Sequence, residues 1–337
     1  MNLGKFPRQR FGHFPTPLEY MKNLSEHLGG PRIYIKRDDC TGLASGGNKT
    51  RKLEFLIADA LRQGADTVIT QGATQSNHVR QTIAAANLVG LRTLVLLESR
   101  VTNLDEEYAE SGNVLLDHLL GGEIVAHLPA GTDMNAAMEE LAEELRNQGR
   151  KPYVIPGGGS NAIGALGYVA CGLEIMQQAY ELNLDFSTII HGTGSTGTQA
   201  GLLAACEGTQ SRIAVMGVSV RAAQAPQQAN VKKLANLTLD LLGINVRVTD
   251  SATLVDDGYV GAGYGQPTPE MIEALQLAAR KEGILLDPVY SGKGMAGLIG
   301  QIREGRYSRD ENIVFVHTGG SAALLGYRSV LPTNARA

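Results

Sequence analysis

The stretch Thr188-Ile-Ile-His-Gly-Thr-Gly-Ser-Thr-Gly-Thr-Gln-Ala-Gly-Leu-Leu-Ala-Ala205 predicts a β-strand, a glycine-rich loop and an α-helix in direct succession. The short apolar run at residues 188–191 is typical of a buried strand, and the leucines and alanines after Gln199 favour a helix. A strand that leads directly into a helix is the repeating unit of a parallel α/β sheet.

The same alternation of short β-rich runs and longer helical runs continues in both directions along the chain. Strands are expected at residues 67–71, 93–97, 124–127, 153–156, 188–191, 213–220 and 313–318, and helices at residues 77–89, 135–147, 162–179, 199–206, 227–242, 269–282 and 292–304. This order predicts an α/β protein with parallel sheets flanked by helices. Because a sheet of this length is expected to divide, we expect a smaller lobe at residues 50–160 and a larger one formed by residues 1–49 and 161–337.

Size and charge limit the classes of function. The chain has 337 residues, 43% of them hydrophobic, and a net charge of −4, so it is globular and lacks the basic stripe that nucleic-acid binding needs. Its longest apolar runs, such as residues 213–220, are far too short to span a membrane, and residues 1–10 lack the apolar core of a secretion signal. We therefore expect a cytoplasmic protein that binds neither nucleic acid nor membrane.

The cysteines and histidines carry no metal signal. Cys40, Cys171 and Cys206 are an odd number of cysteines without a Cys-x-x-Cys spacing, which argues against a disulfide framework and a zinc site. All three are expected to be buried thiols. The seven histidines also lack a metal-ligand spacing, so no metal is expected.

Residues 192–198 have the composition of a phosphate-binding loop. Their glycines let backbone N–H groups approach an anion, and the following helix start adds partial positive charge. Hydroxyl groups are supplied by Thr193, Ser195, Thr196 and Thr198. A compact phosphate monoester is the ligand that these donors favour.

Two alternatives remain open for this loop. Gly192, Gly194 and Gly197 also satisfy the Gly-x-Gly-x-x-Gly fingerprint of dinucleotide oxidoreductases. That fingerprint expects an acidic residue at the end of the next strand, where this chain has Arg221, so the alternative requires a 2′-phosphorylated cofactor. The other alternative is a glycine-rich turn without a ligand.

A second glycine-rich loop delivers a lysine to a helix start. The segment Ser45-Gly-Gly-Asn-Lys49 leads into an amphipathic helix whose apolar residues repeat at helical spacing from Leu53 to Leu61. The positive end of the helix dipole and burial both disfavour an ammonium ion, so we expect a low pKa for Lys49, as a nucleophilic lysine requires. The alternative is a solvated lysine near a helix start.

Residues 67–78 repeat the layout of strand, loop and helix. An amino-acid carboxylate would suit this helix start, held by backbone N–H groups and by Thr74, Gln75 and Ser76. The alternative is that Ser76 or Asn77 caps the helix without any ligand. His78 is a candidate for a proton shuttle or for a hydrogen-bonded structural histidine.

Two tyrosines lie in glycine-rich loops nearer the C-terminus. Tyr290 and Ser291 are expected at a strand end, directly before a helix start, and Tyr264 lies in Gly263-Tyr-Gly-Gln-Pro267. Each tyrosine alone is a candidate for packing, and beside a reactive lysine both become candidates for proton transfer or for clamping a substrate. Lys293 is the competing lysine, but it lacks the glycine-rich approach of Lys49.

Six motifs along the chain are those of one enzyme family. They are Ile35-Lys-Arg-Asp-Asp39, Gly46-Gly-Asn-Lys-Thr-Arg-Lys-Leu-Glu54, Gln75-Ser-Asn-His78, Gly194-Ser195, Asp287-Pro-Val-Tyr290 and His317-Thr-Gly-Gly320. From Phe6 to Tyr327 the chain resembles the fold-type II pyridoxal 5′-phosphate enzymes of the 1-aminocyclopropane-1-carboxylate deaminase / D-cysteine desulfhydrase family. The resemblance implies a two-lobed fold like that of tryptophan synthase β, with a smaller substrate-side lobe and a larger lobe that binds the cofactor phosphate, and it implies a homodimer.

The resemblance also implies roles for single residues. Lys49 would hold the cofactor covalently and move the Cα proton, and Asn77 would hydrogen-bond to the cofactor's phenolic oxygen. Ser76 and its neighbours would hold the substrate carboxylate. The cofactor phosphate would be bound by Gly194, Ser195, Thr196, Gly197 and Thr198.

On the substrate side, the resemblance implies that Tyr264 and Tyr290 line the site and that Ser291 faces the pyridine nitrogen of the cofactor. A hydroxyl group there leaves the cofactor a moderated electron sink, which suffices when a good leaving group departs from Cβ. Family members that open the cyclopropane ring have a glutamate at the position of Ser291. The resemblance therefore favours α,β-elimination over ring opening.

Within this family the similarity is greatest to the L-cysteate sulfo-lyases. It rests on Arg37-Asp-Asp-Cys-Thr-Gly42, Gln71-Gly-Ala-Thr-Gln-Ser-Asn77, Asp133-Met-Asn135, Ile155-Pro-Gly-Gly-Gly-Ser-Asn161 and Val220-Arg221-Ala222. The implied reaction converts L-cysteate, a small amino acid, to pyruvate, sulfite and ammonia, with Thr74 or Arg221 contacting the sulfonate. The leading alternative is D-cysteine, with hydrogen sulfide as the leaving group. A protein that binds an amino acid without turnover is a third possibility.

Overall fold

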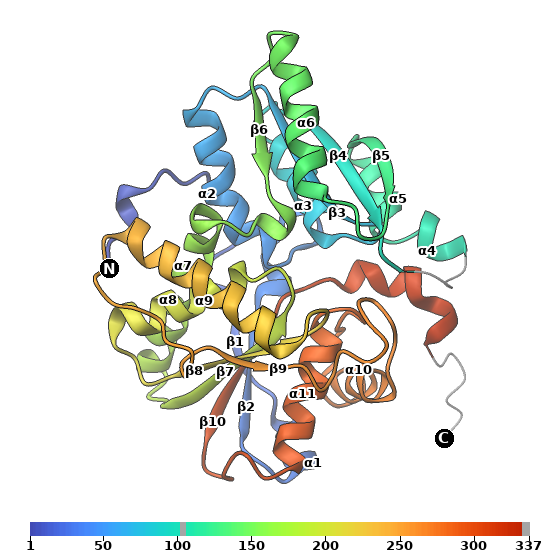
Figure 1. Ribbon diagram of the computed structural model, residues 1–337. Coiled ribbons are helices and arrows are strands. Elements are labelled where there is room, and N and C mark those ends of the chain that lie inside the picture. Colours follow the sequence, from blue (N-terminus) through green and yellow to red (C-terminus); the bar gives the residue numbers. More distant parts are fainter. Residues whose placement is uncertain (102–105, 332–337) are drawn as a thin grey trace.

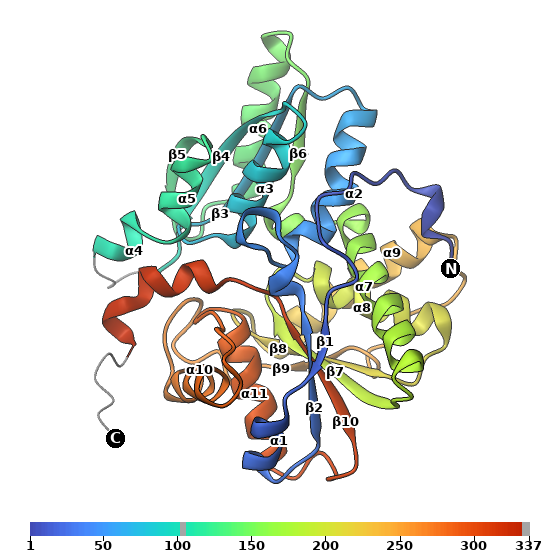
Figure 2. The ribbon, with the colours of Figure 1, turned by 180° about the vertical axis from the view of Figure 1, so that it is seen from behind.

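Two β-sheets form the centre of the molecule (Figures 1 and 2). The computed structural model describes residues 1–101 and 106–331. Its larger sheet has six strands in the order β1 (Leu18–Tyr20), β2 (Arg32–Arg37), β10 (Asn312–His317), β7 (Phe186–Thr193), β8 (Ala214–Ser219) and β9 (Leu254–Asp256). Strand β1 runs antiparallel to β2, and the other neighbouring pairs are parallel.

The smaller sheet lies at the opposite end of the molecule from α1 and β2 (Figure 1). Its four strands are parallel and follow the order β5 (Glu123–Pro129), β4 (Arg92–Ser99), β3 (Thr67–Ala73) and β6 (Pro152–Ile155). All four fall inside the smaller lobe predicted at residues 50–160. The bounds of that lobe stay a prediction.

Helices flank both sheets. They are α1 (Lys22–Leu28), α2 (Lys49–Arg62), α3 (Asn77–Asn87), α4 (Glu106–Glu110), α5 (Asn113–Leu119), α6 (Met134–Asn147), α7 (Ala162–Glu181), α8 (Gly197–Thr209), α9 (Gln224–Leu242), α10 (Pro269–Glu282) and α11 (Ser291–Arg303). Short 3-10 helices include η3 (Leu43–Ser45), η4 (Gly157–Gly159) and η5 (Ser321–Val330). The predicted architecture of parallel sheets flanked by helices is confirmed.

Strand β4 shows how the smaller sheet is buried on both faces. Leu94 and Leu96 belong to a cluster with the apolar side of α6, whereas Val95 and Leu97 pack against α3. Successive side chains of a strand point to opposite faces, so a continuous apolar run serves two helix layers. Each such side chain contributes about 1.5–3 kcal/mol when fully buried.

The larger sheet follows the same rule. In β10, Ile313 and Phe315 join a cluster with α1, α10 and α11, while Val314 and Val316 join a cluster with α7, α8 and α9. All four side chains are fully buried. The sheet is therefore a rigid layer that fixes where its strand ends lie.

Two local predictions are corrected by the structure. Residues 285–290 form no strand: the carboxylate of Asp287 accepts hydrogen bonds from the backbone N–H groups of Val289 (3.0 Å) and Tyr290 (2.8 Å), which folds the segment into a turn before α11. Cys40 is exposed rather than buried, because it lies in a short 3-10 turn after β2, whereas Cys171 and Cys206 are buried as predicted.

Residues 1–101 and 106–331 show neither a membrane-spanning helix nor a metal site. None of the helices there combines the length and the apolar character that crossing a bilayer demands. The same residues contain no group of three or more His, Cys, Asp or Glu side chains arranged to hold a metal ion.

Candidate functional site

The strand ends of both sheets converge on one cavity of about 210 Å³. Most of its wall is formed by residues at or shortly after the carboxyl ends of β3, β4 and β6 in the smaller sheet and of β7, β8 and β10 in the larger sheet. Asn48, Lys49, Tyr264 and Tyr290 complete it. Ligands of open parallel sheets bind at this edge. The cavity is therefore the candidate active site.

The loop before Lys49 requires its two glycines. Gly46 and Gly47 have φ angles of 76° and 132°, which disfavour other residues. A Cβ atom on Gly46 would lie 2.0 Å from the carbonyl oxygen of Asp39, and one on Gly47 would lie 2.6 Å from Nε2 of Gln81. This tight approach places Lys49 as the first residue of α2, facing the cavity, as the sequence predicts.

Burial gives Lys49 the electrostatics of a nucleophile. Loss of hydration, opposed by the negative charge of Asp287 and assisted by the positive charge of Arg80, lowers the pKa of Lys49 to about 8. Its Nζ donates a hydrogen bond of 2.8 Å to Oδ1 of Asn48. On the order of a tenth of this amine is thus neutral, and reactive, at pH 7, far more than for a lysine with the ordinary pKa of 10.5.

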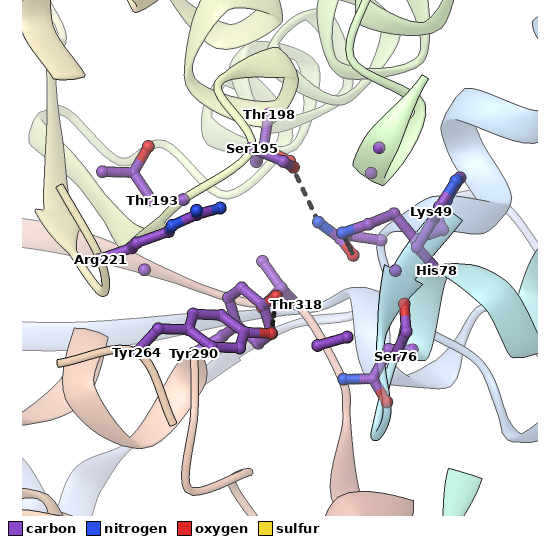
Figure 3. Close-up of a pocket in the computed structure, with 18 of the residues that line it drawn as sticks. Lys49, Ser76, His78, Thr193, Ser195, Thr198, Arg221, Tyr264, Tyr290 and Thr318 are labelled. Atoms are coloured by element: carbon purple, nitrogen blue, oxygen red, sulfur yellow. Dashed lines mark hydrogen bonds between the residues drawn. The ribbon is translucent and has the colours of Figure 1, made fainter. Parts of the chain in front are cut away.

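Asn48 connects Lys49 to the glycine-rich loop between β7 and α8. Its Nδ2 donates a hydrogen bond of 3.0 Å to Oγ1 of Thr198, drawn as a dashed line in Figure 3. Gly194, Ser195 and Thr196 line the cavity beside Thr198, at the N-terminus of α8. The predicted phosphate loop and the predicted reactive lysine therefore face one cavity.

The loop lies close to a second buried lysine that the sequence analysis missed. A Cβ atom on Gly197 would lie 3.0 Å from Nζ of Lys52, so the loop approaches this lysine closely at Gly197, although Gly197 does not line the cavity wall. Nζ of Lys52 donates a hydrogen bond of 3.0 Å to the carbonyl oxygen of Gly158. Burial first, and the charge of Lys49 second, hold the pKa of Lys52 well below its usual range.

Burial makes the charged form of Lys52 unfavourable, and no carboxylate among the described residues is paired with it. An anion bound in the loop would stabilise that charged form. A signal for Lys52 was available in the sequence, since residues three apart lie on the same helix face and Lys52 follows Lys49 by three.

The second helix start, at α3, combines capping with a donor that faces the cavity. Oγ of Ser76 accepts a hydrogen bond of 3.2 Å from the backbone N–H of Val79, so Ser76 caps the helix while it also lines the cavity. Oδ1 of Asn77 accepts hydrogen bonds of 3.0 Å from both Arg80 and Asn113. With its oxygen fixed in this way, Asn77 presents its Nδ2 donor to the cavity.

Two predicted substrate contacts are not brought to the wall. Nε2 of Gln75 donates hydrogen bonds to the carbonyl oxygens of Tyr108 (2.7 Å) and Ser111 (2.8 Å), and the side chain thereby holds the α4–α5 segment. Thr74 does not line the cavity either. Of the three side chains proposed for the carboxylate, only Ser76 is in place, and the backbone N–H groups of the α3 start remain available.

His78 lines the cavity but is engaged by the protein. Its Nε2 lies 2.8 Å from Oγ1 of Thr70. The hydroxyl proton of Thr70 is donated to the carbonyl oxygen of Ile155 (3.0 Å), so in the contact with His78 the Thr70 oxygen accepts and Nε2 donates. Burial, with smaller effects of Lys49 and Lys52, keeps the pKa of His78 well below its usual range. Of the two alternatives for His78, a proton shuttle or a hydrogen-bonded structural histidine, this arrangement favours the second.

Tyr264 and Tyr290 form a hydrogen-bonded pair on the opposite side of the cavity from Ser76 and His78 (Figure 3). Their hydroxyl oxygens are 2.7 Å apart and their rings meet edge to face at 72°. Nζ of Lys49 lies 5.9 Å from the centre of the Tyr290 ring. Burial raises the pKa of both phenols, so both are neutral donors at neutral pH.

The residues after Tyr290 support the site from behind. Oγ of Ser291 donates to Oδ1 of Asp287 (2.6 Å) and accepts from the backbone N–H of Asp287 (2.7 Å), so this hydroxyl is fully buried and does not reach the cavity wall. Lys293, the competing lysine, donates to the carbonyl oxygens of Val260 (2.6 Å) and Gly263 (3.0 Å). It therefore positions the loop that carries Tyr264.

The cavity wall is basic. Arg221, which follows β8, points into the cavity beside the tyrosine pair (Figure 3) and forms no ion pair within the described residues. Arg100, directly after β4, also lines the cavity and was missed by the sequence analysis, although its place after a buried strand was a signal. No aspartate or glutamate is among the described residues that line the wall.

Comparisons with known proteins agree with this geometry. A family model described as a pyridoxal-phosphate dependent enzyme matches residues 10–319. A solved structure titled as the crystal structure analysis of an ACC deaminase homologue is similar to this chain with a TM-score of 0.87 and 39% sequence identity, over 97% of this chain and 96% of that one.

Proposed function

The chain belongs to the pyridoxal-phosphate dependent enzyme family, and on that basis we propose that it catalyses the α,β-elimination of L-cysteate to pyruvate, sulfite and ammonia. The family assignment replaces the dinucleotide alternative for the Gly-x-Gly-x-x-Gly loop. The proposal extends the family's cofactor chemistry to one substrate, a small amino acid with a sulfonate on Cβ. We further propose, as the family resemblance implies, that the protein acts as a cytoplasmic homodimer.

The residues present fit the cofactor. The loop from Gly194 to Thr198 and the buried amine of Lys52 suit a phosphate group, and Nδ2 of Asn77 suits a phenolate oxygen. Lys49, with a pKa near 8, suits covalent capture of an aldehyde. When bound, pyridoxal phosphate supplies the electron sink for a carbanion at the substrate Cα.

The chain's own groups would then carry out the steps of the reaction. Ser76 and the backbone N–H groups of the α3 start hold the substrate carboxylate, and the amine of Lys49 takes the proton from Cα. The electron pair of that bond forms the Cα–Cβ double bond, while the carbon–sulfur bond breaks and its electron pair leaves with sulfite. Water then hydrolyses the released enamine to pyruvate and ammonia, so no oxidant or reductant is needed.

The basic wall is the observation that carries the choice of substrate. Arg221 faces the cavity and forms no ion pair with any residue in the described ranges, and none of the lining residues there is acidic. A sulfonate carries its negative charge at all pH values of interest, whereas a cysteine thiol, with a pKa of about 8.5, is mostly neutral at pH 7. A guanidinium group can also donate two hydrogen bonds to the oxygens of a sulfonate, which a thiol does not offer. These properties support L-cysteate over D-cysteine as the substrate.

A panel of β-substituted amino acids tests the proposal. The purified holoenzyme is incubated with L-cysteate, D-cysteate, L-cysteine, D-cysteine and 1-aminocyclopropane-1-carboxylate, and pyruvate, 2-oxobutyrate, sulfite and sulfide are measured. We expect the highest kcat/KM for L-cysteate, with equal amounts of sulfite and pyruvate. A higher kcat/KM for D-cysteine, or 2-oxobutyrate from the cyclic amino acid, would overturn the proposal.

Cofactor capture should report the low pKa of Lys49. Because only the neutral amine attacks an aldehyde, the rate at which the apoenzyme captures pyridoxal phosphate should rise with pH up to about 8 and then level off. For a lysine with the ordinary pKa of 10.5, the rate would continue to rise up to the highest pH measured. Stopped-flow absorbance between pH 6 and 10 measures this, and a rate still rising above pH 9 would contradict the burial argument.

Lys52→Met should weaken cofactor binding. Methionine is chosen because its side chain has nearly the length of lysine but carries no charge. A charge-assisted bond to phosphate contributes about 1.5–3 kcal/mol, so the Kd for pyridoxal phosphate should rise about 10- to 100-fold. Titration of the apoenzyme with cofactor, followed by absorbance, gives the Kd. Lys281→Met, which changes an exposed lysine in the last turn of α10, is the control and should leave the Kd unchanged.

A further inference from the structure

We propose that Arg100 and Arg221 together form a subsite for a tetrahedral oxyanion, and that Arg100 is the residue that selects the sulfonate leaving group. This inference rests on the proposed function, because it assigns a role within that reaction. Arg100 comes from the smaller sheet and Arg221 from the larger one, so the two guanidinium groups approach the cavity from different sheets.

Arg100 is held in one orientation by the protein. Its Nε is paired with Oε2 of Glu98, and its Nη2 lies 3.3 Å from Oε1 of Gln71. Glu98 is itself fixed, because its other oxygen accepts a hydrogen bond of 3.0 Å from the backbone N–H of Gly131. These contacts leave Nη1 of Arg100 without a partner in the described part of the chain, as a donor prepared for a ligand.

Lys49 and Arg100 each lie beside one member of the tyrosine pair. Nζ of Lys49 lies 5.9 Å from the centre of the Tyr290 ring, the two tyrosine hydroxyls are 2.7 Å apart, and the guanidinium carbon of Arg100 lies 5.6 Å from the centre of the Tyr264 ring. The amine of Lys49 thus lies beside Tyr290, and the guanidinium group of Arg100 lies beside Tyr264 of the same hydrogen-bonded pair. A substrate whose Cα is reached by Lys49 would extend its Cβ substituent along this pair toward Arg100.

Arg100 and Arg221 both lie close enough to Tyr264 and to Glu98 to influence their pKa values. Burial raises the pKa of Tyr264, and the positive charges of Arg100 and Arg221 both oppose this rise. The same two charges help to hold the pKa of Glu98 below its usual value although burial acts to raise it. Only Arg100 is paired with Glu98, so the charge of Arg221 is left over. The surplus positive charge beside Tyr264 is what an anionic substituent would neutralise.

The subsite has a chemical task during elimination. As the carbon–sulfur bond breaks, its electron pair moves to sulfur, and the departing sulfite carries one more negative charge than the bound sulfonate. Fixed guanidinium groups stabilise this developing charge more strongly than they stabilise the substrate. A chlorine atom on Cβ also takes the electron pair and leaves as chloride, but in the bound substrate it is neutral and has no oxygens for a guanidinium group to bind, so it gains less from the two arginines.

Substitution of Arg100 tests the assignment with two substrates. For Arg100→Gln we expect kcat/KM for L-cysteate to fall about 30-fold or more, and kcat/KM for β-chloroalanine to change by less than about 3-fold. Arg100→Lys should recover part of the loss, because a lysine keeps the charge without the bidentate fork. Equal losses for both substrates would show a merely structural role and overturn the proposal.

Arg92→Gln is the matched control. Arg92 lies at the start of the same strand and is paired in the same way with a glutamate, Glu123, but it is exposed and does not line the cavity. We expect it to leave kcat/KM for both substrates unchanged. A loss of cysteate turnover in Arg92→Gln equal to that in Arg100→Gln would assign the effect to the strand rather than to the subsite, and would overturn the proposal.

A binding measurement separates this inference from the proposed function. Methanesulfonate carries the sulfonate but has no amine or carboxylate, and it should inhibit turnover of β-chloroalanine by the wild-type holoenzyme competitively. In Arg100→Gln its inhibition constant should rise about 10-fold or more, whereas Arg92→Gln should leave it unchanged. Absence of inhibition, or equal inhibition of Arg100→Gln, would overturn the subsite even if L-cysteate is a substrate. Failure of the wild-type enzyme to act on L-cysteate, with methanesulfonate still bound through Arg100, would overturn the proposed function alone.

Discussion

Lys49→Ala should abolish covalent cofactor binding and reduce pyruvate formation by about 10³-fold or more, the largest effect expected in this chain. The amine is the first side chain of α2, its Nζ is held 2.8 Å from Oδ1 of Asn48, and the two glycines before it adopt positive φ angles that bring the chain to this helix start. Reduction of the holoenzyme with borohydride, followed by peptide mapping, should place the reduced cofactor on Lys49. The variant should show no such adduct.

Lys293→Ala is the informative comparison for this experiment. Burial lowers the pKa of Lys293 to about 8, as it does for Lys49, so a low pKa alone does not distinguish the two amines. Lys293, however, donates to two carbonyl oxygens of the Tyr264 loop. The Lys293→Ala variant should therefore keep the borohydride adduct on Lys49, and an adduct that disappeared with Lys293 instead would refute the assignment.

Much of this site could be predicted because its parts are local. The glycines before Lys49, the loop from Gly192 to Thr198 and the Ser76 cap each combine a strand end with a helix start within about ten residues of the chain. Such a unit leaves a pattern in the sequence that needs no knowledge of distant partners. Parallel sheets then brought these separate units to one edge, as the alternation of strands and helices predicts.

For two predicted site residues, the structure shows side-chain partners within the protein that the sequence pattern does not reveal. Gln75 was assigned to a ligand because it lies in a loop of the expected composition, but its side chain contacts Tyr108 and Ser111, more than thirty residues away. Ser291 was expected at the cofactor from the resemblance, and its hydroxyl is occupied by Asp287. A sequence pattern identifies which groups are available, and only packing decides which partner each one takes.

The missed residues have the same origin. Arg100 becomes a site residue because β4 ends at the cavity and Glu98 turns its guanidinium group in that direction. Lys52 becomes one because α2 packs beside the loop that contains Gly158. Short elements of three to seven residues also escaped prediction, because so few residues show no clear periodicity; they are β1, α1, β2, α4, α5 and β9.

The same α2 helix carries a buried ion-pair network that should dominate the stability of the site. Arg51, two residues after Lys49, is fully buried, and its guanidinium group donates two hydrogen bonds of 2.8 Å to Asp38. Asp38 also accepts hydrogen bonds from Thr16 (2.9 Å) and Tyr168 (2.6 Å). The positive charges of Arg51 and Lys36 hold the pKa of Asp38 low despite its complete burial.

Asp38→Ala should therefore lower the free energy of unfolding by about 3–5 kcal/mol, because among the described residues it leaves the buried guanidinium of Arg51 with the carboxylate of Glu174 as its only acidic partner. Equilibrium unfolding in urea measures the loss. Asp240→Ala, which removes the partner of an exposed ion pair with Arg247, should leave the unfolding midpoint unchanged. Since Arg51 fixes the first turn of α2, Asp38→Ala should also weaken cofactor binding. An Asp38→Ala protein as stable as the wild type would mean that the network does not anchor Lys49.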